Sequence, residues 1–197
     1  MPCPRSKEKI LVCACEMFYH NGYQATSVDN IIRRCGVVKS NFYYHFKNKE
    51  ELGFAVIEIH FLEFAALVES TLGSTSAAPA MRLELFFDRM CFKQQAGKTA
   101  GCPFGNLAAG LAVDGDETSE RFRHRLCELF DTTQSALTQC LAAGVECGDF
   151  RPDIVPEEMA FILLAALEGA LMLAKTHRDC LMITDRLRTL SRLLRTQ

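Results

Sequence analysis

Residues 36–49, GVVKSNFYYHFKNK, gather side chains that could hold an anion. Lysine ammonium groups lie towards both ends, and hydroxyl, amide and imidazole groups lie between them. All of these groups can donate hydrogen bonds to phosphate oxygens. The aromatic residues of the same stretch could equally pack into a hydrophobic core. The sequence therefore leaves two interpretations open: a buried aromatic cluster, or a surface that meets an anionic partner.

Charge is distributed unevenly along the chain, although its net charge is only −2. Residues 1–49 carry eight lysines and arginines against three acidic residues, a balance of +5. The remaining residues carry 14 basic and 21 acidic side chains, a balance of −7. A basic N-terminal segment on an acidic body favours a polyanionic partner for that segment alone.

The sequence gives little support for a metal site, a catalytic site or a bound cofactor. Its five histidines are scattered and its ten cysteines include no CxxC pair, so we predict no metal site. There is no candidate nucleophile beside a base and no glycine-rich phosphate loop, so we predict no catalytic residues and no cofactor. An α-helical enzyme remains the alternative from a different functional class.

Signals for export or membrane insertion are also missing. The first residues, MPCPRSKEK, contain no apolar segment. The longest apolar run, residues 159–174, is shorter than the roughly 20 residues that span a bilayer, and Glu168 interrupts it. We therefore expect a cytoplasmic protein with no membrane partner, in which this run forms a largely buried helix.

Helices are the elements that must position the anion-binding candidates. Apolar residues recur at i, i+3 and i+4, and strand-like alternation does not appear. Gly22 and Gly36 mark helix ends, Thr26 or Ser27 marks a start, and Pro103 suits a first helical position. The expected helices span about residues 10–21, 26–35, 38–46, 48–72, 80–96, 103–113, 117–147, 156–175 and 180–195. The predicted fold class is all-α.

Two short helices separated by a glycine turn, after a packing helix, describe a helix-turn-helix. In this arrangement the second short helix enters the major groove of DNA. Residues 18–52 resemble the DNA-binding domain of the TetR/AcrR family of bacterial transcriptional regulators. The residues that carry the resemblance are Phe18, Gly22, Tyr23, Thr26-Ser27-Val28, Ile31, Gly36-Val37, the FYYHF run and Lys49.

The resemblance assigns roles to individual residues. It implies a DNA-binding helix-turn-helix domain over residues 1–50 and an effector-binding and dimerisation domain over residues 51–197. The implied DNA contacts are Thr26, Ser27, Lys39, Ser40, Asn41, Tyr43, Tyr44, His45 and Lys49. Phe42 and Phe46 are expected to face the core. Val38 stands where the family usually has serine, so the recognition helix is expected to lack a side-chain cap.

The resemblance also implies the assembly and its control. It points to a homodimer on a near-palindromic DNA operator, usually a repressor, that a small-molecule effector releases. Aromatic and methionine residues of the body suit an apolar or aromatic effector, although each could belong to ordinary core. The candidate pocket residues are Phe61, Phe64, Phe86, Phe87, Met90, Phe104, Leu107 and Met172.

A second mode of control stays open at Cys102. If Pro103 is the first residue of a helix, Cys102 lies at its N-cap, where the helix N-terminus favours a thiolate, and Lys98 is close in sequence. Some branches of the family sense electrophiles or oxidants through a cysteine. A thiol-based repressor is therefore the alternative to one that answers a reversible ligand. Whether a ligand or a thiol reagent releases DNA would distinguish the two.

Overall fold

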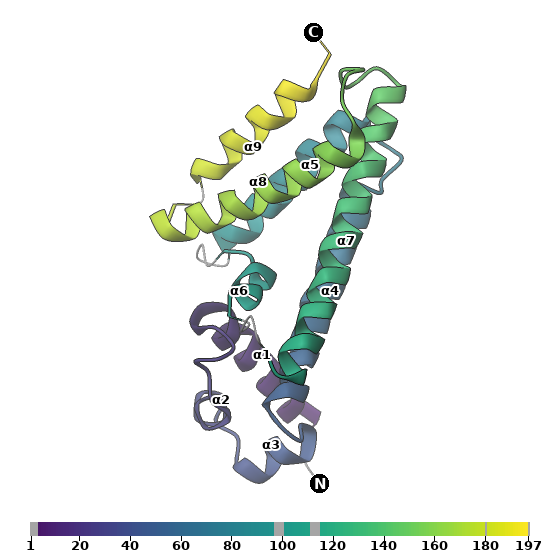
Figure 1. Ribbon diagram of the computed structural model, residues 1–197. Coiled ribbons are helices and arrows are strands. Elements are labelled where there is room, and N and C mark those ends of the chain that lie inside the picture. The colour runs from purple at the N-terminus through teal and green to yellow at the C-terminus, as the bar shows by residue number, and fades with distance from the viewer. Residues whose placement is uncertain (1–3, 97–100, 111–114, 180, 197) are drawn as a thin grey trace. The chain divides into compact units, whose positions relative to one another are not determined.

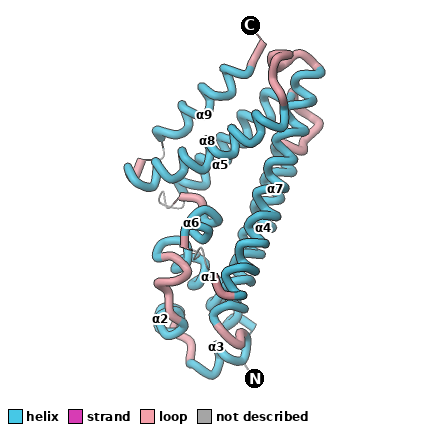
Figure 2. Tube along the Cα trace, viewed as in Figure 1, coloured by secondary structure: helices cyan, strands magenta, loops and turns pink. Residues whose placement is uncertain are grey.

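The computed structural model describes residues 4–96, 101–110, 115–179 and 181–196. In these ranges every regular element is a helix (Figures 1 and 2), and the single β-type pairing is an isolated bridge between Phe150 and Arg195. The predicted all-α fold is thus confirmed. The helices are α1 Pro4–Asn21, α2 Val28–Cys35, α3 Lys39–His45, α4 Lys49–Thr71, α5 Pro79–Ala96, α6 Pro103–Ala109, α7 Glu117–Glu146, α8 Pro156–His177 and α9 Leu181–Leu194.

The chain forms two compact units. Unit 1 comprises Met1–Leu62 and Pro103–Leu126, and unit 2 comprises Glu63–Cys102 and Cys127–Gln197. Helices α4 and α7 each contribute residues to both units. The predicted domain boundary at residue 50 stays a prediction, because unit 1 groups α6 and parts of α4 and α7 with the first three helices.

Local hydrogen bonds explain where α2 begins and ends. The Ser27 hydroxyl accepts a hydrogen bond from the Asn30 amide at 3.1 Å, so Ser27 supplies the predicted N-cap. Gly36 ends the helix with φ 65°, a left-handed conformation that glycine adopts without strain, and its N–H donates to the Ile32 carbonyl. Ser27 thus sets where α2 begins, and Gly36 sets the turn between α2 and α3.

The starts of α3 and α4 differ in how they are capped. Val38 precedes α3 and makes no side-chain capping bond, as its side chain predicts. At α4 the Asn48 carboxamide oxygen accepts from the Glu51 amide at 2.8 Å, while the Glu51 carboxylate accepts from the Lys47 amide at 2.7 Å. This is a capping box whose return bond reaches one residue further back than usual.

Packing in the core of unit 1, rather than a side-chain cap, holds α3 in position. Buried apolar side chains from α1, α2, α3, the following loop and α4 form one cluster. Its fully or nearly fully buried members are Ile10, Ala14, Ile31, Phe42, Phe46, Leu52 and Val56. A seven-residue helix is unstable alone, so burial of Phe42 and Phe46 supplies most of what orders α3.

Unit 2 is built on the packing of α9 against α5 and α8 (Figure 1). One face of α8 is buried through Ala160, Leu163, Leu167, Leu171 and Ala174. Two ion pairs join α5 to α9 and to Arg195, the residue after α9. The Arg188 guanidinium donates to both Asp88 carboxylate oxygens at 3.1 and 3.0 Å, and Arg195 donates to Glu84 at 2.8 Å. Both pairs are partly exposed, so each adds little stability beside the apolar packing.

The opposite face of α8 is apolar and exposed. Phe161, Ile162, Met172 and Leu173 lie on it, and a Cβ added at Gly169 would meet no other atom within 4 Å. At 22 residues α8 extends beyond the apolar run 159–174, and by length and composition it could span a membrane. That is weak evidence, because a core helix of a soluble protein passes the same test.

Candidate nucleic-acid interface

Residues 36–49 present both a buried aromatic face and an exposed polar face, and contact of the exposed face with an anionic partner stays a prediction. Phe42 is fully buried and Phe46 is 3% exposed, which confirms their predicted core positions. Tyr43 and Tyr44 are 48% and 67% exposed, and Lys39 and Ser40 are exposed as well. The aromatic residues at i and i+4 therefore face inward, and the polar side chains between and before them form an outward surface.

At the start of α2, Thr26 and Ser27 differ in what they present to solvent. The Thr26 side chain is buried, and its hydroxyl donates to the Gly22 carbonyl at 2.8 Å. Ser27 is exposed while its hydroxyl caps α2. Of these two predicted contacts, only Ser27 exposes its side chain to a partner in the free protein.

Asn41 and His45 lie at the border between the inward and outward faces. The Asn41 carboxamide donates to the Ser6 hydroxyl of α1 at 3.4 Å. The His45 Nε2 atom is buried and has no hydrogen-bond partner among the described residues, while its ring meets the edge of Tyr44 at 4.9 Å. Their predicted contacts with DNA stay predictions.

Lys49, the first residue of α4, is held by its surroundings. Its ammonium lies 4.3 Å from the centroid of the Tyr23 ring and donates to the Gln24 carbonyl at 3.4 Å. Partial burial lowers the pKa of Lys49 from its ordinary value. These contacts hold the Lys49 side chain in position in the free protein. Lys39, in contrast, is exposed and pairs with Asp29 at 3.5 Å.

Ion pairs tie the start of α7 to α4 near Lys49. Glu50 accepts from the Thr118 hydroxyl at 3.0 Å and from Arg121 at 2.5 Å. One turn further along, Arg125 donates to both oxygens of Glu58 at 2.6 and 2.8 Å. Stacking of Phe54 on Phe122, with centroids 4.3 Å apart, lies between the two sets of ion pairs. Within unit 1, α7 and α4 therefore pack as one layer.

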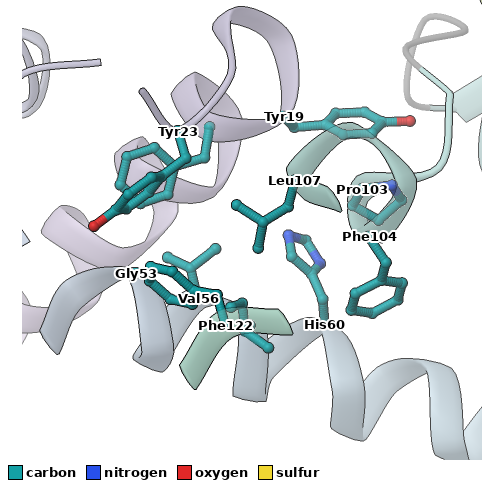
Figure 3. Close-up of a pocket in the computed structure, with 11 residues that line it drawn as sticks. Tyr19, Tyr23, Gly53, Val56, His60, Pro103, Phe104, Leu107 and Phe122 are labelled. Carbon is teal, nitrogen blue, oxygen red and sulfur yellow. The ribbon is translucent and has the colours of Figure 1, made fainter. Parts of the chain in front are cut away.

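Unit 1 also encloses a cavity, shown in Figure 3. Its cavity volume is about 30 Å³, and the space around it is partly open to solvent. Residues of α1, α4, α6 and α7 line it together with Tyr23. The lining residues are Phe18, Tyr19, Tyr23, Gly53, Val56, Ile57, His60, Pro103, Phe104, Leu107 and Phe122.

The predicted effector residues are distributed over both units. Phe104 and Leu107 line the unit 1 cavity. Phe61 in unit 1 lies under the Arg125 guanidinium at 3.8 Å. In unit 2, Phe64 meets the edge of buried Phe86, Phe87 and Met90 are buried, and Met172 is exposed. Phe18, Tyr19, Tyr23, His60 and Phe122 were absent from the predicted set, because sequence spacing alone does not show that α1 and α6 approach each other.

Cys102 directly precedes α6, as predicted from Pro103, but its surroundings differ from those of reactive thiols. It is buried, and its thiol hydrogen-bonds to Glu168 of α8. A neighbouring carboxylate disfavours a thiolate, whereas reactive thiols lie beside positive charge. Lys98, expected to supply that charge, lies outside the described residues.

The Glu168–Cys102 contact predicts a pH dependence of stability. Burial raises the pKa of Glu168, and the bond from Cys102 opposes the rise. Because the folded-state pKa exceeds the unfolded one, the contribution of Glu168 to stability is present at acidic pH and is lost as pH rises through the folded-state pKa. Glu168→Gln, whose amide oxygen still accepts from Cys102, should therefore gain stability over the wild type as pH rises from 4 to 8.

Denaturant unfolding across this pH range measures the effect. Asp131→Asn, which neutralises an exposed carboxyl on α7, is the matched control and should run parallel to the wild type. Parallel curves for the wild type and Glu168→Gln would show that ionisation of Glu168 costs the folded state nothing.

The described part of the chain holds neither a metal-binding cluster nor a disulfide bond. It contains no group of three or more His, Cys, Asp or Glu side chains that could hold a metal ion. None of the cysteines that the structure describes forms a disulfide. Burial and the neighbouring Cys35 raise the pKa of Cys13, which keeps that thiol protonated.

Two family models match the chain. Residues 10–56 match the model described as bacterial regulatory proteins of the tetR family. Residues 79–190 match a tetracyclin repressor-like C-terminal domain. The first match covers α2 and α3, and the second covers α5 through most of α9.

Characterised relatives and solved structures agree with these matches. The HTH-type transcriptional repressor DhaR of Mycobacterium sp. strain GP1 is 29% identical over 83% of this chain and 79% of its own length. The transcriptional regulator AcuR of Cereibacter sphaeroides is 31% identical over 85% of this chain and 75% of its own. A crystal structure of the regulatory protein TetR from Rhodobacter sphaeroides superposes with a TM-score of 0.82 at 28% identity, over 95% of this chain and 97% of that one.

Proposed function

Because the chain belongs to the TetR family of bacterial regulatory proteins and is a DNA-binding transcriptional regulator, we propose that it acts as a homodimeric repressor in the cytoplasm. It binds a near-palindromic operator and leaves it when a small apolar or aromatic molecule binds. The repressor DhaR among its relatives supports the sign of regulation. The balance of +5 in residues 1–49 supports a polyanionic partner for this segment.

The observation that carries the proposal is the division of α3 into two faces. Phe42 anchors the helix inward, and Lys39, Ser40, Tyr43 and Tyr44 are exposed together on it. A short helix with exposed hydrogen-bonding side chains at its start is what a helix-turn-helix places in the major groove. Lys49 and Ser27 flank this surface as candidates for phosphate contact.

The exposed face of α8 supports the dimer, with a second copy of this chain as its occupant. Large apolar side chains lie at both ends of the face, and Gly169 lies between them with open space above it. Small residues let two helices approach closely while larger ones interdigitate around them. A twofold axis across this face makes the interface self-complementary and pairs two α3 helices with two half-sites about 34–36 Å apart.

The test is selection of DNA by the protein from a random pool, followed by titration of the selected sequence. We expect an inverted repeat whose half-site centres are one helical turn apart, bound by two protomers. Recovery of a direct repeat or of single half-sites would contradict the twofold arrangement, and failure to enrich any sequence would contradict specific DNA binding.

Lys49→Ala and Asn41→Ala should affect DNA binding in different ways. Loss of the Lys49 ammonium removes one phosphate contact per protomer, so the slope of log affinity against log salt should fall by roughly 1.8 for a dimer. Asn41→Ala should instead change the preferred bases with little change in salt slope. Titrations of the selected operator and of a scrambled duplex at several salt concentrations separate the effects. An unchanged salt slope for Lys49→Ala would show that Lys49 does not make the assigned phosphate contact.

Control by a reversible ligand fits the described residues better than control by Cys102. The Cys102 thiol is buried and bonded to a carboxyl group. The matched family consists of transcriptional regulators and gives no support to the interpretation as an α-helical enzyme.

A further inference from the structure

Two cysteine thiols of unit 1 touch each other across α1 and α2. Cys13 lies near the middle of α1 and Cys35 is the last residue of α2, and a hydrogen bond joins the two thiols. Both side chains pack against the apolar core of the unit while remaining partly exposed. An ion pair between Glu16 and Arg34, at 3.6 Å, joins the same two helices beside the thiols. The fold therefore holds the pair in contact and leaves it accessible from solvent.

The surroundings of the two thiols give them different chemical roles. Burial, followed by the neighbouring Cys35, raises the pKa of Cys13, and the hydrogen bond between the thiols helps to keep the proton on Cys13. The Cys35 thiol donates to the Ile32 carbonyl at 3.7 Å, a weak bond because a thiol is a poor donor. Since a thiolate is the form that attacks an oxidant, Cys35 is the member of the pair that reacts first. Cys13 then lies in contact with the oxidised sulfur.

We propose that Cys13 and Cys35 are a peroxide-reactive pair, which closes into a reversible disulfide and so spares Cys35 from irreversible oxidation. In the first step the Cys35 thiolate attacks hydrogen peroxide, the O–O bond breaks, and a sulfenic acid forms with release of hydroxide. In the second step the Cys13 sulfur attacks the Cys35 sulfur, and the S–O bond breaks as the S–S bond forms. The hydroxyl group leaves as water with the proton from Cys13. The two thiols lose two electrons, and one peroxide is reduced to two waters.

The crosslink should stabilise the DNA-binding unit without rebuilding it. The thiols are already in contact, so closing the bond requires rotation of the two side chains and no new position of either helix. The disulfide encloses residues 14–34, and closing a loop of this length should lower the unfolding equilibrium constant of unit 1 about 30-fold or more. Thiol reductants of the cytoplasm would reverse it. The inference goes beyond the proposed function, because it concerns survival of this unit under oxidation and leaves operator release aside.

Peptide mapping of the full-length protein tests the pair after treatment with limiting hydrogen peroxide and blocking of the remaining thiols. Trypsin places Cys35 in the peptide 35–39 and places Cys13 and Cys15 together in the peptide 10–33. We expect a disulfide between these peptides in the wild type and in Cys15→Ser, the matched control on α1, and none in Cys13→Ser. In Cys13→Ser, more Cys35 should reach the sulfinic and sulfonic acids than in the wild type.

Three mapping results would overturn the pair. The first is a wild type whose two peptides are not joined. The second is a Cys13→Ser protein in which they still are. The third is an equal yield of sulfinic acid at Cys35 in the wild type and in Cys13→Ser, which would show that Cys13 gives no protection.

Denaturant unfolding tests the crosslink, followed by tyrosine fluorescence because all four tyrosines lie in unit 1. Oxidised wild type should unfold at higher denaturant than reduced wild type, dithiothreitol should remove the difference, and Cys13→Ser should show none. Operator affinity of the oxidised wild type should match that of the reduced protein. A loss of affinity that dithiothreitol restores and Cys13→Ser avoids would overturn the claim that the unit keeps its DNA-binding form. If the reduced protein bound no operator, the proposed function would fall, and mapping and unfolding would still decide the pair.

Discussion

Replacing Gly169 by arginine is expected to make the protein monomeric and to weaken operator binding about a hundredfold or more. The added side chain would place a charge in the middle of the apolar face of α8, where the proposed second copy would approach. A protomer that binds one half-site loses the gain from simultaneous engagement of two, which is commonly 10²–10⁴-fold. Multi-angle light scattering gives the oligomeric state, and operator titration gives the affinity.

Ser135→Arg is the control for Gly169→Arg. It adds the same charge to an exposed polar position of α7, and it should remain a dimer with wild-type affinity. Since a Cβ added at Gly169 would meet no other atom within 4 Å, its arginine variant should keep the helical content of the wild type. A Gly169→Arg protein that stays dimeric would show that the two copies meet through another surface.

Phe42→Ala should lower the free energy of unfolding of unit 1 by about 3–5 kcal/mol, because it empties a fully buried position of the core. DNA binding should be lost with it, since α3 depends on this anchor for its order. The chain has four tyrosines, all within residues 19–44 of unit 1, and no tryptophan. Tyrosine fluorescence during denaturant unfolding of the full chain therefore follows this unit.

Tyr44→Ala is the matched variant on the outward face of the same helix. With its ring 67% exposed, Tyr44 should affect the free energy of unfolding by no more than about 0.5 kcal/mol, while operator affinity falls. If both variants lost stability equally, the assignment of inward and outward faces on α3 would be wrong.

The helices and their ends were predictable because their signals are local. Ser27 and Gly36 delimit α2 through bonds that span three and four residues, and Pro103 begins α6 for reasons contained in its own ring. The i, i+4 spacing of Phe42 and Phe46 places them on one face, and the family resemblance implied that this face is the inward one. The roles at the DNA surface came from the family resemblance, because exposed polar residues carry no periodic signal of their own.

What could not be predicted depends on residues that are far apart in sequence. The cavity forms only where α1, α4, α6 and α7 pack together. The apolar pattern of each helix does not show which other helices lie beside it. The inward turn of the Thr26 hydroxyl depends on the carbonyl of Gly22, and the bond between Cys102 and Glu168 joins two distant segments. Such contacts follow from tertiary packing, which helical periodicity does not predict.

The apolar face of α8 also bears on how the regulator responds to its own abundance. When subunits meet only at sufficient concentration, the concentration of dimer at low expression rises with the square of the protomer concentration. Operator occupancy then changes more steeply than protein level. A regulator of this kind turns a modest change in its own synthesis or dilution into a sharper change at its promoter, without any contribution from the effector.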